Sequence, residues 1–110
     1  VAEQQIQPNG QANDASRLAH TETFYKVVDV ADDSTTVYDG PCLLFGVYVN
    51  TGLSAHVLPI KDNTTTVVSI AASAAAGTNT TFPGIRFETS LIVDPNDSGT
   101  GSVTVAYRPL

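Results

Sequence analysis

The chain has 110 residues, with five Lys and Arg against eleven Asp and Glu and a formal charge of −6, so we expect a single acidic domain. The few basic residues are scattered, which argues against nucleic-acid binding, and no apolar run approaches the roughly 20 residues that a membrane helix needs. A single Cys cannot form an internal disulfide, so the fold is not expected to depend on oxidation.

Residues 1–20 differ in composition from the rest of the chain. They are rich in Gln, Asn and Ala and show no strand alternation. We interpret them as an extended N-terminal arm, either a disordered tail or a segment that orders on a partner, with Ile6, Pro8 and Leu18 as its candidate partner-binding residues. The first ten residues lack the basic and apolar regions of a signal peptide, so none is expected. The absence of Met leaves open whether Val1 follows a removed initiator Met or a processing site.

From residue 21 onward the sequence is typical of β-strands. "TETFYKVVDV" (21–30) alternates between two faces, and "ADDSTTVYDGP" (31–41) combines a turn with a short strand. "CLLFGVYVN" (42–50) is a nearly continuous apolar run, which predicts a central strand covered on both faces. Gly46 within this run indicates a bulge or a close backbone approach.

The second half of the chain continues in the same way. Pro59 in "LSAHVLPIKD" predicts an edge strand or the end of its pairing. "NTTTVVSIAAS" (63–73) predicts a strand, and we expect its "TVVSIAA" portion to be paired on both edges because it would aggregate if exposed. The pattern predicts a loop over 74–84, one long or two short strands over 85–94, a loop over 95–101 and a last strand in "SVTVAYRP"; a short helix at 71–77 is the alternative.

These elements amount to about seven or eight strands at a spacing of roughly 10 residues, separated by Gly, Pro, Asn or Asp. Such spacing is typical of an all-β antiparallel β-sandwich or jelly roll. We therefore predict two parts, an extended arm over 1–20 and a β-sandwich domain over 21–110.

Cys42 is the first candidate for chemistry. A nucleophilic Cys needs a nearby base or a helix N-terminus to lower its pKa, and only His20 and His56 offer imidazoles. Cys42 instead begins an apolar strand, which favours a buried core residue. His56 is interpreted as a surface or rim residue. The sequence shows neither a G-x-S-x-G motif nor closely spaced zinc ligands, so we predict a protein that is not an enzyme and carries no catalytic, metal or cofactor residues.

"DPNDSGTG" contains part of a calcium-loop pattern. Asp94, Asn96, Ser98 and Gly99 occupy its first, third, fifth and sixth positions, but the twelfth position is Val105 instead of the required Glu. The same residue types are those that a β-turn prefers. We favour the turn, and whether the Asp94–Gly99 loop binds calcium stays open.

Two longer stretches, "YDGPCLLFGVYVNTG…VLPIKD" and "FPGIRFETSLIVDPNDSGTGSVTVAYRP", carry a resemblance to a known family. They resemble small structural proteins of tailed bacteriophages, and the resemblance covers roughly residues 37–109. It implies a β-sandwich component of the virion, of the head decoration or cement type or a small fibre or tail subunit. It implies no catalytic residues.

The resulting expectation is a capsid decoration protein that binds the outer surface of a bacteriophage head and stabilises it. Its partner would be the major capsid protein, it would form a homo-oligomer, with a trimer favoured, and it would lie on the capsid surface of virions assembled in the host cytoplasm. A sandwich face bearing Tyr48, Tyr107 or Phe82 would supply subunit contacts, unless these are core residues. The alternative is a small tail-fibre or receptor- or carbohydrate-binding module.

Overall fold

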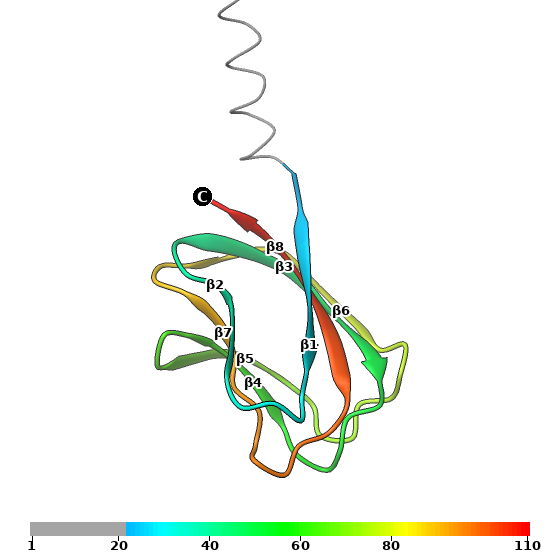
Figure 1. The fold of residues 1–110 in the computed structure, drawn as a ribbon. Coiled ribbons are helices and arrows are strands. Elements are labelled where there is room, and N and C mark those ends of the chain that lie inside the picture. The colour runs from blue at the N-terminus through cyan, green and yellow to red at the C-terminus, as the bar shows by residue number, and fades with distance from the viewer. Residues whose placement is uncertain (1–21) are drawn as a thin grey trace, which may run out of the picture.

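The structure, a computed structural model, describes residues 22–110, which form two four-stranded sheets that face each other (Figure 1). The predicted arm over 1–20, including Ile6, Pro8 and Leu18, lies outside the described residues. Within residues 22–110 no helix is long and apolar enough to cross a membrane. The strands in chain order are β1 (Phe24–Asp29), β2 (Thr35–Tyr38), β3 (Cys42–Thr51), β4 (Leu58–Asp62), β5 (Thr65–Ile70), β6 (Asn79–Phe87), β7 (Leu91–Val93) and β8 (Ser102–Pro109).

The strand order is that of a jelly roll, which confirms the predicted class. Sheet A has the order β1-β8-β3-β6 and sheet B the order β2-β7-β4-β5. The antiparallel pairs β1·β8, β2·β7, β3·β6 and β4·β5 are nested. The chain therefore runs out through the first four strands and returns beside itself through the last four, a long hairpin rolled into two packed sheets.

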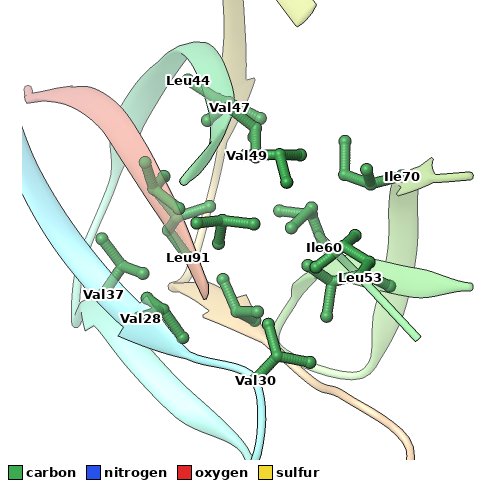
Figure 2. Close-up of a cluster of buried hydrophobic side chains, with 14 of the residues drawn as sticks. Val28, Val30, Val37, Leu44, Val47, Val49, Leu53, Ile60, Ile70 and Leu91 are labelled. Carbon is green, nitrogen blue, oxygen red and sulfur yellow. The ribbon is translucent and has the colours of Figure 1, made fainter. Parts of the chain in front are cut away.

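The core lies between the sheets and receives side chains from all eight strands (Figure 2). Alternation along each strand produces it: Val103 and Val105 of β8 have no exposed surface, whereas Thr104 between them points to the other side of sheet A. Fully burying one such aliphatic side chain stabilises the fold by about 1.5–3 kcal/mol. The buried apolar set is Val28, Val30, Val37, Cys42, Leu44, Val47, Val49, Leu53, Leu58, Ile60, Ile70, Phe87, Leu91, Val93, Val103 and Val105.

Three aromatic rings link the two sheets near the start of β1. The ring of Tyr107 in β8 lies 6.1 Å from that of Phe24 in β1 and 5.7 Å from that of Tyr38 in β2, measured between centroids. Both pairs are tilted, which is a favourable arrangement for aromatic rings. Because Tyr38 belongs to sheet B, this cluster ties the two sheets together where the chain enters sheet A.

β3 is a central strand, as predicted, and it lies between β8 and β6. The prediction that both of its faces are covered is wrong, because sheet B packs on one side only and Tyr48 on the other side is 45% exposed. Its pairing shifts between Leu44 and Gly46 on both sides, so Phe45 is an extra, bulged residue. A Cβ at Gly46 would lie 3.0 Å from the carbonyl oxygen of Thr80. Both readings of Gly46, a bulge and a close backbone approach, are therefore confirmed.

Of the two alternatives predicted from Pro59, the edge strand is wrong, and the end of pairing is confirmed on the side of β7. β4 is an interior strand, paired with β5 on one side and β7 on the other. Its ladder with β7 begins only at Ile60, and the carbonyl oxygen of Pro59 accepts the N–H of Asp94 just beyond it. Pro59 therefore sits where that ladder ends, and its missing N–H costs no strand pairing.

The prediction that "TVVSIAA" is paired on both edges is also wrong. β5 is the outer strand of sheet B and pairs with β4 alone. Its register shifts opposite Ile60 and Lys61, which leaves Val67 as a bulged residue that is 36% exposed. A bulge disrupts the regular edge that another strand would extend, which is one way in which edges are protected.

Two further predictions in this part of the chain need correction. The short-helix alternative at 71–77 is wrong, because this segment is a loop with turns. The predicted loop over 74–84 ends early, since β6 already begins at Asn79. Pro83 is tolerated within β6 because β6 is the outer strand of sheet A.

The four loops that connect β1 to β2, β3 to β4, β5 to β6 and β7 to β8 meet at one end of the sandwich. The N–H of Val30 donates to the carbonyl of Gly101 over 2.9 Å, and that of Leu53 donates to Ala74 over 2.9 Å. Ser54 joins the β3–β4 loop to two of the others, because its N–H donates to Thr100 of the β7–β8 loop and its carbonyl accepts the N–H of Ser73 of the β5–β6 loop. These loops therefore hold one another in place.

Candidate protein-binding face

The outer side of sheet A carries the most exposed large apolar side chains. On β1, Tyr25 is 72% and Val27 57% exposed, and on β3, Tyr48 is 45% exposed. They point away from the core because Val28, Val47 and Val49, next to them in sequence, point into it. Clustered exposed apolar side chains, unlike isolated ones, are typical of interaction sites.

The register of sheet A places these three side chains in two adjacent rows. Val27, Thr104 and Tyr48 lie opposite one another across β1, β8 and β3, and in the next row Tyr25 faces Ala106, which faces Gly46. The centre of the face is therefore lined by Thr104 and Ala106 of β8, which have larger residues on both sides only in the first row. The side-chain amide of Asn50 donates to the hydroxyl of Thr104 over 2.7 Å, which holds the side chain at the middle of the first row. We call this surface, formed by Tyr25, Val27, Tyr48, Thr104 and Ala106, the sheet A face.

One end of the same side of sheet A is basic. Arg108 of β8 and Arg86 of β6 are the cross-strand neighbours of Leu43 on either side of β3. The Arg108 guanidinium carbon lies 4.7 Å from the centre of the Phe45 ring. Arg86 pairs with Glu88 over 3.0 Å, an exposed ion pair that contributes little to stability.

Cys42 is a core residue, as predicted. Its side chain has no exposed surface and lies in the apolar cluster between the sheets. Burial, and secondarily the negative charge of Asp62, raises the pKa of the Cys42 thiol to about 11. The thiol is therefore protonated at neutral pH and is a poor nucleophile.

Of the residues that were predicted to supply subunit contacts, the structure places one on the exposed surface and two against the core. Tyr48 is exposed on the sheet A face, whereas Tyr107 and Phe82 are half-buried and pack against the core. His56 lies half-buried in the loop between β3 and β4, and so at a rim as expected. His20 and the arm residues fall outside the described range.

The loop between β7 and β8 has the geometry of a turn. The side-chain oxygen of Asn96 accepts the N–H of Ser98 over 2.9 Å, and the Asn96 carbonyl accepts the N–H of Gly99 over 2.8 Å. The carboxylate of Asp94 is engaged by Lys61 of β4 at 2.7 Å. Two of the oxygens in the calcium pattern are thus already bound elsewhere, and the described residues include no group of three or more His, Cys, Asp or Glu placed to hold a metal ion.

Asp62 has a structural role that the sequence did not indicate. Its carboxylate, at the end of β4, accepts N–H groups from Glu88, Thr89 and Ser90 in the turn between β6 and β7, over 2.9, 3.0 and 3.2 Å. The bond from Glu88 is the main cause that holds the Asp62 pKa below its usual value, and it outweighs partial burial, which acts in the opposite direction.

The exposure of the sheet A face and the contact between Arg108 and Phe45 were likewise missed. Alternation in "FYKVVD" signals two faces but not which neighbouring strand covers them. Only Gly46 pointed to the bulge that carries Phe45. Comparison of the chain with protein-family models, with curated proteins and with solved structures yields no match.

Proposed function

We propose that this chain is a structural protein of a bacteriophage virion, a capsid decoration protein that binds the outer surface of the head through the sheet A face and stabilises it. The observation that carries the proposal is the grouping of Tyr25, Val27 and Tyr48 on one exposed sheet surface whose centre is lined by small residues. Aromatic side chains such as Tyr are enriched among the few residues that supply most of the binding energy in protein interfaces.

The fold supports the proposal by analogy. Jelly rolls occur in viral capsid domains, and also in lectins and cupins, so the fold alone does not select a function. The chain enters sheet A at Phe24, at the start of the outer strand β1, where Tyr25 begins the sheet A face. We propose that Ile6, Pro8 and Leu18, in the part of the chain that precedes this strand, contact the shell or a neighbouring subunit.

Many copies on a shell would act by multivalency. A trimer that binds three equivalent shell sites converts the second and third contacts into intramolecular events, so a modest contact per subunit gives tight attachment. Holding neighbouring shell subunits together in this way would raise the temperature at which the heads open. The major capsid protein is the proposed partner.

The test uses heads of the encoding virus, prepared without this protein. The full-length chain should sediment with these heads and raise their disruption temperature. Replacing Tyr25, Val27 and Tyr48 by Ser together should reduce binding at least tenfold, whereas the matched changes Val57→Ser and Val67→Ser, at apolar residues exposed elsewhere, should not. Equal binding by both variants would exclude the sheet A face, and no binding by the wild type would exclude the proposed function.

A carbohydrate-binding module, as on a tail fibre, is the second candidate. Two exposed tyrosines on one face, Tyr25 and Tyr48, favour it, because sugars stack on aromatic rings. A saccharide that binds the folded state would raise the melting temperature of the free protein. A panel of bacterial surface glycans that leaves the melting temperature unchanged would exclude this candidate.

A further inference from the structure

Arg108 differs from Lys61 and Arg86, two other cations on strands of the sandwich. Among residues 22–110, Lys61 is paired with Asp94 and Arg86 with Glu88, whereas the Arg108 Nε is buried and has no hydrogen-bond partner. A buried donor without an acceptor is costly in a folded protein and calls for an explanation. In a chain with a formal charge of −6, it is also unexpected that no carboxylate within residues 22–110 forms an ion pair with this guanidinium.

The backbone around Arg108 is shaped to hold its guanidinium in place. Phe45 is the extra residue at the bulge of β3, and bulges re-aim a side chain in this way. Opposite it, β6 contains three residues between the partners of Leu44 and Gly46, among them Gly84, whose φ is +124°. A Cβ at Gly84 would lie 3.2 Å from the Phe45 ring, so glycine leaves room for the ring on which Arg108 lies.

A guanidinium that lies on an aromatic ring is fixed in orientation while it keeps its in-plane N–H donors. Carboxylates match this planar arrangement of donors and are bound by Arg in two-point contacts. Arg108 is half-buried as a residue, and because its Nε has no exposed surface, a partner's carboxylate has to contact the two terminal Nη groups of the guanidinium. The second cation, Arg86, lies on the far side of Leu43, about 10 Å away between strand axes, and its charge is offset by the carboxylate of Glu88 at 3.0 Å. Among residues 22–110, Arg108 therefore carries the unpaired positive charge at this end of the sheet.

We propose that Arg108, held on Phe45, binds the carboxylate of an Asp or Glu side chain on the partner protein that covers the sheet A face. This inference rests on the proposed function and names the chemistry of the partner: an apolar contact surface with an acidic residue at one end. Charge complementarity selects this partner. The positive charge of Arg108 matches a carboxylate, and the uncharged sheet A face beside it matches an apolar surface. Phosphate groups of nucleic acid are disfavoured by the overall charge and by Glu88 beside Arg86.

The first arm of the test uses heads that lack this protein. Arg108→Gln should weaken binding to these heads at least tenfold and remove most of its salt dependence. Arg108→Lys should also weaken binding, because an ammonium keeps the charge but loses the planar donors. Lys61→Gln, the same charge change on sheet B, should bind within about twofold of wild type; circular dichroism must show all three variants folded.

The second arm does not depend on heads. In ¹⁵N-labelled full-length protein, the Arg108 Nε–H resonance, identified by its loss in Arg108→Lys, is followed by NMR during titration with acetyl-Leu-Glu-Leu-amide. This peptide should shift the resonance, and the matched acetyl-Leu-Gln-Leu-amide should not. Equal shifts with both peptides, or none with either, overturn the carboxylate inference.

The two arms separate this inference from the proposed function. If wild type and Arg108→Gln bind heads equally well, the proposed function stands and the inference fails. If the wild type does not bind heads, the proposed function fails and the peptide titration alone decides the inference. If Arg108→Gln instead dissolves a homo-oligomer of the free protein, the carboxylate belongs to a second copy of the chain, and the partner assigned here is wrong.

Discussion

The carboxylate of Asp62, at the end of β4, accepts the backbone N–H of Glu88 over 2.9 Å, although 26 residues separate them in the chain. Two further N–H groups of the same turn, those of Thr89 and Ser90, donate to the other carboxylate oxygen. The carboxylate thus ties the turn between β6 of sheet A and β7 of sheet B to the end of β4. No other side chain in the described residues accepts as many backbone N–H groups.

Replacing Asp62 by Ala should destabilise the domain by about 1–3 kcal/mol at pH 7, because three backbone donors lose an acceptor. In a domain of this size, each kcal/mol lost should lower the melting temperature by about 4–8 °C, as measured by circular dichroism. Asp97→Ala, which removes an exposed acid from a turn, is the control and should change the melting temperature little. Equal effects of the two changes would mean that the hydrogen bonds of Asp62 do not contribute.

The lowered pKa of Asp62 also predicts how stability depends on pH. A carboxyl group whose pKa is lower in the folded than in the unfolded chain stabilises the fold above its unfolded pKa, near 4, and this stabilisation is lost as the pH falls through the folded pKa. Urea unfolding of the wild type should therefore show falling stability below about pH 4. Asp62→Asn should show a shallower slope in this window, and an unchanged slope would contradict the assignment.

Cys42 should resist thiol reagents in the folded protein. Because the thiol is buried and its pKa is raised to about 11, modification by dithionitrobenzoate at pH 8 should require unfolding and should become fast in urea. The pH dependence of this contribution to stability is opposite to that of Asp62. The raised pKa of Cys42 stabilises the fold below the pKa of the unfolded chain, near 9, and this stabilisation is lost as the pH rises toward 11. Rapid modification without urea would show that Cys42 is accessible.

Substitutions at Gly101 and Gly77 should distinguish two effects of replacing a glycine, the backbone strain and the steric clash of the added Cβ. Both have positive φ, at +118° and +93°, so Ala at either position strains the backbone by about 1–3 kcal/mol. Only at Gly101 would the new Cβ also meet backbone atoms, at 2.7 Å from the carbonyl oxygen of Gly52 and 2.9 Å from that of Thr51, whereas nothing lies within 4 Å at Gly77. Gly101→Ala should thus be clearly more destabilising in urea titrations, and equal losses would exclude the steric contribution.

The sequence predicted those features that depend on local pattern. The apolar run from Cys42 identified a central strand and a buried thiol, and strand spacing identified the sandwich. Features that depend on contacts between distant segments were missed or wrong. Because Pro lacks an N–H for strand pairing, Pro59 predicted either an edge strand or the end of pairing, and only the position of β7 shows that the second alternative holds. Likewise, the role of Asp62 depends on a turn 26 residues away, and no local pattern announces it.

The sheet A face is another feature that the local sequence pattern could not predict. Alternation separates the side chains of β1 into two sets, but which set is buried depends on sheet B, which packs on one side of sheet A only. Tyr25 and Val27 have the residue types of a buried strand, yet they lie on the outer side. Local pattern therefore predicts the two faces of a strand, and only the packing of the sheets shows which of them is available to a partner.

β5 supplies the last prediction, because it is an uncharged outer strand that pairs with β4 alone. Its bulged residue Val67 is 36% exposed, and heating should free this edge for pairing between molecules. Val67→Glu should therefore reduce light scattering on heating while changing the free energy of unfolding by no more than about 0.5 kcal/mol. Val57→Glu makes the same change at a residue in a loop and should leave scattering unchanged. If both variants reduced scattering equally, added negative charge rather than the β5 edge would be responsible.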